Sequence, residues 1–122
     1  VMTGYNSVSR IGQAVCLPGD IVMGTLSGVL FIPSHLVAEV INDAEKTHAK
    51  DIFGFEMIRK GTYTTAQIDS SVWNQDMMDN LLKFLDTDER CEKYRELDWS
   101  LELKAAAGDK KALEEVLKSC LT

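Results

Sequence analysis

The chain has 122 residues, a length typical of a single domain with a modest core. Hydrophobic residues make up 45% of it and charged residues 26%, a balance that excludes global disorder. The formal net charge of −6 argues against general binding to nucleic acid phosphates, and no apolar run approaches the ~20 residues that a membrane-spanning helix needs.

The first third of the chain predicts short β-strands in residues 7–16, 21–23 and 29–32. The last of these is a continuous apolar run that Gly28 and Pro33 bound on either side. Continuous apolar runs of this length are typical of strands buried on both faces. We therefore expect an α/β (α+β) fold, with layers above and below this strand.

Two turns connect these strands. In residues 17–20, Pro18 presets φ at one corner and Gly19 accepts the positive φ of the next. Residues 24–28 carry a glycine at either end, a density also found in anion-binding loops. Because a strand follows and the P-loop ending is missing, a strand-connecting turn is the favoured interpretation.

The middle of the chain predicts helices. Apolar residues recur at helical spacing in residues 34–44, with Ser34 as the expected N-cap. A second apolar stripe leads to Gly61, which stands where a glycine closes a helix. Beyond it, Thr64 and Gln67 have the spacing of a capping box.

Further helices are predicted for residues 72–85, 89–106 and 110–121. The last two are separated by a glycine and by Asp109, a suitable N-cap. Together with the middle of the chain, this makes four to five helices.

The cysteines and histidines predict neither a disulfide framework nor a zinc site. Cys16, Cys91 and Cys120 are odd in number and widely spaced, which fits reduced thiols in a cytoplasmic setting. His35 and His48 are too far apart in sequence for a metal-ligand motif, so surface or capping roles are expected.

Among the carboxylates, Asp51 is the single catalytic candidate. It stands directly before an apolar-glycine segment, although most such carboxylates are solvated surface groups. Trp73 and Trp99 fall in helical patterns and are expected to be packing anchors rather than platforms for base stacking.

Residues 10–22 and 28–33, with Pro18-Gly19-Asp20 and Gly28-Val29, resemble one known family. It contains the regulator of ribonuclease activity A and the 4-hydroxy-4-methyl-2-oxoglutarate aldolases, often labelled dimethylmenaquinone methyltransferase-like. The resemblance covers residues 2–85, and residues 61–69 resemble a bacterial subgroup of longer members. It implies that the chain divides into two parts. Residues 1–85 would be the C-terminal portion of the aldolase-like domain, and residues 86–122 would be a helical extension.

The resemblance also implies a layered α/β/β swivelling-type sheet and a homo-oligomer, a trimer or higher. In the full-length family Mg²⁺ or another divalent metal serves as cofactor, and Asp51 would approach the site of a neighbouring protomer. Two departures matter. Thr25 and Ser27 replace the family's aspartates, and its G-x-R-D segment, which supplies substrate and metal ligands, is missing, so we expect a segment upstream of Val1.

Two functions follow as hypotheses. The first is a fragment of a metal-dependent aldolase or decarboxylase that acts on 4-hydroxy-2-keto acids or oxaloacetate, inactive as an isolated chain because metal-assisted cleavage needs those ligands. The second is a non-catalytic protein-binding module related to the ribonuclease regulators, whose acidic charge suits a basic protein partner. Neither nucleic acid nor membrane is expected as a partner.

Overall fold

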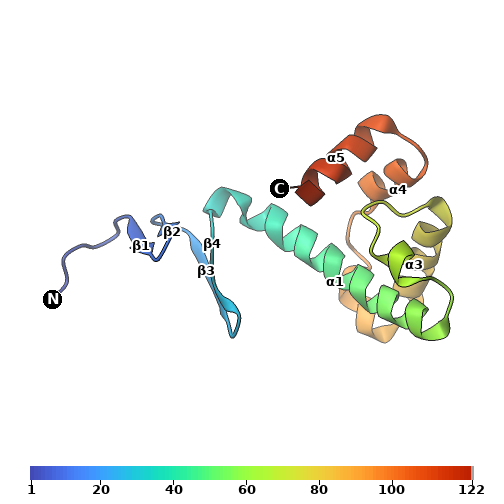
Figure 1. The fold of residues 1–122 in the computed structure, drawn as a ribbon, viewed down its shortest axis with the longest axis horizontal. Coiled ribbons are helices and arrows are strands. Elements are labelled where there is room, and N and C mark those ends of the chain that lie inside the picture. Colours follow the sequence, from blue (N-terminus) through green and yellow to red (C-terminus); the bar gives the residue numbers. More distant parts are fainter. Residues whose placement is uncertain (122) are drawn as a thin grey trace. The chain divides into compact units, whose positions relative to one another are not determined.

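The computed structural model describes residues 1–121 and the side chains of residues 1–119 (Figure 1). It divides into two compact units, a strand unit, Val1–Asp43, and a helical unit, Ala44–Thr122. The fold is mixed α+β, as the sequence predicts.

The strand unit contains two antiparallel hairpins. The first pairs β1 (Ser9–Ile11) with β2 (Ala14–Cys16), and the second pairs β3 (Ile21–Thr25) with β4 (Gly28–Ile32). The predicted turn before β3 is confirmed. Gly19 has φ of 89°, and Asp20 closes the turn by accepting a hydrogen bond from the Leu17 amide at 3.0 Å.

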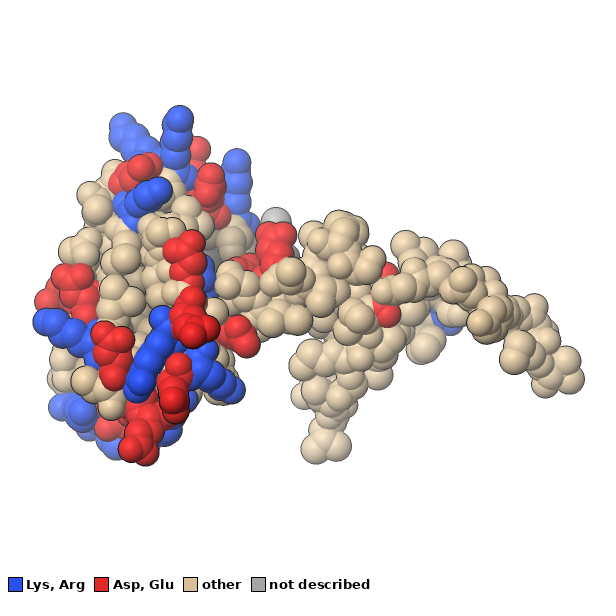
Figure 2. Space-filling model, turned by 180° about the vertical axis from the view of Figure 1, so that it is seen from behind, with Lys and Arg blue, Asp and Glu red and all other residues tan. Residues whose placement is uncertain are grey.

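The expected burial of residues 29–32 on both faces is wrong for the described chain. Val29 and Leu30 are exposed, and only Ile32 at the end of β4 is buried. The apolar run does form a strand, but within the strand unit β3 and β4 make a two-stranded sheet whose side chains stay largely exposed. The described strands thus do not include the larger layered sheet that the family resemblance implies. Figure 2 shows the charged side chains gathered over the helices and a hairpin without charge.

The second half of the fold begins with a 3₁₀ turn, η1 (Ser34–Leu36), and the long helix α1 (Val37–Lys60). The prediction of Ser34 as N-cap is wrong, because Pro33 precedes the turn and no side chain caps it. The two predicted apolar stripes belong to this one helix. No glycine or proline lies between Leu36 and Phe53 to interrupt it.

Helix α1 ends as predicted at Gly61, which has φ of 73°. The Gly61 amide donates to the Ile58 carbonyl at 3.1 Å, and the Thr62 amide donates to the Met57 carbonyl at 3.0 Å. These two bonds form a Schellman motif, in which the left-handed conformation of glycine lets the last carbonyls find donors.

The next helices begin at side-chain caps. The predicted capping box of α2 (Thr65–Ile68) is confirmed, with Thr64 and Gln67 exchanging hydrogen bonds of 3.2 and 2.9 Å. Helix α3 (Gln75–Thr87) begins where Asn74 accepts a hydrogen bond from the Met77 amide at 2.9 Å. It therefore starts later than the apolar pattern predicts.

The predicted single helix over residues 89–106 is wrong. The segment forms a 3₁₀ helix, η2 (Glu89–Tyr94), and a separate helix α4 (Ser100–Ala106). Between them, Arg95 donates to the Leu85 carbonyl at 2.8 Å and Asp98 accepts from the Ser100 amide at 2.9 Å. Such side-chain bonds to the backbone compete with a continuous helix. Helix α5 (Lys110–Leu121) follows, and Asp109 caps it as predicted.

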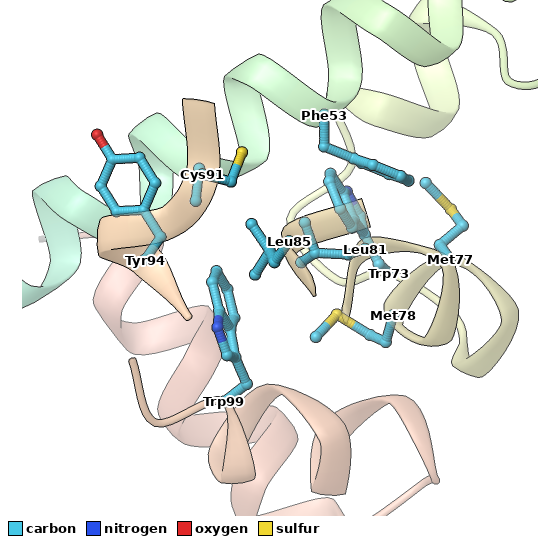
Figure 3. Packing of buried hydrophobic residues seen from close by; sticks show 10 residues of the cluster. Phe53, Trp73, Met77, Met78, Leu81, Leu85, Cys91, Tyr94 and Trp99 are labelled. Carbon is cyan, nitrogen blue, oxygen red and sulfur yellow. The ribbon is translucent and has the colours of Figure 1, made fainter. Parts of the chain in front are cut away.

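The core lies in the helical unit and brings together side chains from α1, α3, η2 and the connecting segments (Figure 3). Trp73 and Trp99 are 4% and 5% exposed, so both are packing anchors, as predicted. The expected division at residue 85 falls inside this core, where Leu85 and Cys91 are both buried. Among the described residues, no helix combines the length and the apolar character that crossing a membrane requires.

Candidate functional site

Asp51 lies exposed on α1 and lines an open pocket beside α2, which we call the α1–α2 pocket. Its volume is about 390 Å³. It is lined by Asp51, Phe55 and Ile58 from α1 and by Thr65, Ala66, Ile68 and Asp69 from α2 and its C-cap. Because Asp51, Phe55 and Ile58 are three and four residues apart, they share one face of the helix.

A glycine in the last two turns of α1 lets α2 approach the helix closely. A Cβ added to Gly54 would lie 2.6 Å from Cγ2 of Ile68, closer than a real Cβ contact allows. The buried Trp73 holds the other side of α2, since its Nε1 donates to the Ile68 carbonyl at 3.1 Å. The position of Ile68, and with it one wall of the pocket, is therefore determined by packing against α1 and by a buried indole.

The chemistry of the pocket is apolar with two acidic groups. Phe55 is 69% exposed, an unusual position for a large aromatic side chain, and Ile58 and Ile68 are half-buried. No Lys or Arg lines the pocket. Within the described part of the chain, the carboxylates of Asp51 and Asp69 have no hydrogen-bond or ion-pair partner, and both are exposed.

The described residues do not fit a divalent-cation site formed by this chain alone. Nowhere among them do three His, Cys, Asp or Glu side chains come within reach of one ion. Mg²⁺ takes oxygen ligands in near-ideal octahedral geometry, and an isolated surface carboxylate such as Asp51 does not provide one.

Neither described cysteine side chain forms a disulfide. Cys16 is half-buried and Cys91 is fully buried in the core. Burial raises the pKa of the Cys91 thiol, so this group stays protonated and is a packing residue rather than a nucleophile. The side chain of Cys120 lies outside the described residues.

The histidines do not meet at a site. His35 is exposed in η1. His48 lies in the middle of α1 rather than near a helix end, and its ring packs 5.8 Å from the ring of Tyr94. Both histidines are exposed, as expected for surface roles, but His48 caps no helix end.

Most charges near the core hold elements together. Lys46 on α1 forms an ion pair of 2.9 Å with Glu102 on α4, and these side chains are only 13% and 15% exposed. Glu56 on α1 lies 3.6 Å from Arg90 in η2, which also pairs with Asp88 at 2.8 Å. The carboxylates of Glu102, Glu56 and Asp88 therefore already have cationic partners. Among the described residues, those of Asp51 and Asp69 have none.

A second candidate surface is the hairpin of β3 and β4, which sequence reasoning treated as part of a buried sheet. Residues 21–32 contain no charged side chain, and the large apolar ones are about half exposed or more from Ile21 through Leu30. A pocket of about 280 Å³ on it is lined by Met23, Thr25, Ser27, Gly28, Val29 and Leu30. Thr25 and Ser27, which lie at or beside the turn of this hairpin, are polar but uncharged.

We compared the chain with protein-family models, curated proteins and solved structures, and found no match to any of them. The family resemblance described above therefore remains a prediction from sequence motifs.

Proposed function

We propose that the chain is a protein-binding module that associates with a second copy of itself through the hairpin of β3 and β4. The observation that carries this proposal is the exposed, uncharged character of residues 21–32. A two-stranded hairpin is marginally stable at best in water, and an open apolar strand edge is a template for pairing with another chain.

The apolar side chains of the hairpin supply the driving force. Val22 and Leu30 are each 57% exposed, and Leu26 at the turn is fully exposed. Complete burial of such a side chain stabilises an association by roughly 1.5–3 kcal/mol. Most of these side chains are about half exposed in the single chain, so burying the rest of their surface offsets part of the cost of bringing two chains together, which is roughly 4–15 kcal/mol.

Charge favours this surface for contact between copies. Two chains of net charge −6 repel each other, and the hairpin is a part of each chain where no charged group would enter the interface. Within the described residues, β3 pairs only with β4, so its outer edge is available to an identical edge in a two-fold contact.

Sedimentation velocity of the full chain tests the proposal. We expect association from micromolar concentrations upward in the wild-type chain. Val22→Lys and Leu30→Lys each place a charge on the hairpin and should yield monomers, whereas Phe55→Lys, an equally drastic change on the exposed face of α1, should leave association intact. A wild-type chain that stays monomeric up to near-millimolar concentration would exclude self-association through this surface.

A second candidate function is the aldolase or decarboxylase fragment. The observation in its favour is that Asp51 offers an exposed carboxylate without a described partner, at the place where the resemblance expects a group that approaches a neighbouring protomer's site. We expect no pyruvate release from 4-hydroxy-4-methyl-2-oxoglutarate or oxaloacetate by this chain alone in the presence of Mg²⁺. Robust turnover would contradict this candidate, because the chain would then hold a complete site. The thiols of Cys16 and Cys91 support a cytoplasmic setting under either proposal.

A further inference from the structure

We propose that the α1–α2 pocket binds a short peptide segment of another protein, in which an apolar side chain is flanked by Lys or Arg residues. This site lies in the helical unit and does not depend on self-association through the hairpin. Its apolar walls and its two carboxylates each point to one part of such a ligand.

The apolar part of the ligand would contact Phe55, Ile58 and Ile68. These side chains come from two helices and line a pocket of about 390 Å³, within the usual range for ligand sites. Aromatic side chains, Phe among them, are enriched at protein interfaces relative to the rest of the surface. One aliphatic side chain of a peptide would bury the open face of Phe55.

The basic part of the ligand would meet Asp51 and Asp69. Both carboxylates line the pocket without a described ion-pair partner, and no cation lines it. Glu56, the next acidic residue of α1 after Asp51, is by contrast already paired with Arg59, Lys60 and Arg90. Exposed ion pairs contribute only about 0–1 kcal/mol each, so these two would determine the specificity and orientation of the ligand more than its affinity.

The pocket is built before any ligand arrives. The capping box of Thr64 and Gln67 sets the start of α2, Gly54 allows Ile68 to pack on α1, and the indole of Trp73 holds the Ile68 carbonyl. A preformed site saves the ordering free energy that a flexible loop would lose on binding. This distinguishes the pocket from a chance gap between two mobile segments.

Fluorescence anisotropy with defined peptides tests the inference. The probe is a labelled peptide with a central Leu between Lys residues, and its matched control carries Glu in place of every Lys. We expect the full chain to bind the Lys peptide and not the Glu peptide, with NMR amide shifts confined to residues 51–69. Phe55→Ala should weaken binding by at least about tenfold.

Charge is tested with a matched pair of double variants. Asp51→Asn with Asp69→Asn should weaken binding by about three- to tenfold and reduce its salt dependence. Asp86→Asn with Glu89→Gln removes the same two charges from exposed positions elsewhere in the helical unit and should leave the affinity unchanged. Equal losses in both double variants would show that only net charge matters and would overturn the proposal.

Three other results would also overturn it. These are absence of binding to the Lys peptide, equal binding to the Glu peptide, and shifts of residues 51–69 when the protein alone is concentrated, which would assign the pocket to a second copy. The Val22→Lys variant separates the two proposals. If it is monomeric and still binds the Lys peptide, the pocket stands independently of the hairpin.

Discussion

Two phenylalanines on α1, two positions apart, have opposite environments. Phe53 is fully buried and lies 5.5 to 6.3 Å, centroid to centroid, from the rings of Phe84, Trp73 and Tyr63. Phe55 is 69% exposed. We expect Phe53→Ala to lower the free energy of unfolding by about 3–5 kcal/mol, because it removes both buried area and ring contacts.

Phe55→Ala is the matched control for this prediction. The substitution removes the same atoms from an exposed position and replaces them with a better helix former, so we expect a change within about 0.5 kcal/mol. Urea unfolding followed by circular dichroism measures both variants. A similar decrease in the unfolding free energy of both variants would mean that Phe53 is not buried in the core in solution.

The lowered pKa of Asp88 makes the free energy of unfolding depend on pH in the acid range. The side-chain hydrogen bond from Arg90 lowers the pKa of Asp88 from 3.8 to about 2. Because the pKa is lower in the folded state, the stabilising contribution is complete above pH 3.8 and is lost as the pH falls toward 2. Asp88→Asn preserves a side-chain cap for η2 but removes the charge.

We therefore expect the unfolding free energy of the Asp88→Asn chain to fall less steeply than that of the wild type between pH 3.8 and about 2. Denaturant unfolding at a series of pH values measures the slopes, and NMR titration of the wild-type carboxyl measures the pKa itself. Parallel slopes, or a titration near the ordinary value for aspartate, would rule out the Arg90 contact in solution.

At the scale of elements, the junction of α1 and α2 depends on Gly54. Glycine inside a helix costs about 0.5–1 kcal/mol relative to alanine, so a structural reason is needed for its presence. Cγ2 of Ile68 supplies that reason, at 2.6 Å from an added Cβ. We expect Gly54→Ala to destabilise the chain by on the order of 1 kcal/mol, because overpacking against a stiff β-branched side chain outweighs the gain in helix propensity.

A double-mutant cycle checks this cause. In a chain that already carries Ile68→Ala, the obstructing methyl group is gone, and Gly54→Ala should stabilise by about 0.5–1 kcal/mol. The sign of the effect thus reverses with the partner residue. The same sign in both backgrounds would show that Ile68 is not what requires glycine in this helix.

At the scale of the whole molecule, the net charge of −6 predicts opposite effects of salt on the two proposed interactions. Raising the ionic strength from about 0.01 to 0.15 M shortens the Debye length from about 30 to 8 Å. Self-association should strengthen, since repulsion between acidic copies is screened. Binding of the Lys peptide should weaken, since its attraction to Asp51 and Asp69 is screened.

Sedimentation velocity and fluorescence anisotropy across this salt range measure the two trends. Self-association that weakens with salt would point to an interface made of opposite charges rather than the uncharged hairpin. If the affinity for the Lys peptide does not change with salt, Asp51 and Asp69 do not contribute to binding, and only the apolar contacts of the pocket remain.

The sequence by itself determined the features that depend on a few neighbouring residues. The turn at Gly19, the helix end at Gly61, the capping box of Thr64 and Gln67, and the cap at Asp109 are confirmed because each is a matter of local backbone conformation and short-range hydrogen bonds. The burial of the tryptophans was also predicted correctly, although both lie outside the helices, Trp73 before α3 and Trp99 at the N-cap of α4.

Only the tertiary structure decided which apolar surfaces are covered and which helices are continuous. Residues 29–32 have the composition of a buried strand, but burial needs other elements on both faces, and the two-stranded sheet of the strand unit leaves Val29 and Leu30 exposed. The α1–α2 pocket likewise depends on the approach of α2 to Gly54, a contact between residues far enough apart that no local pattern encodes it. Whether an apolar side chain is exposed depends on how the whole chain packs. Both proposed interactions use apolar side chains that this packing leaves exposed.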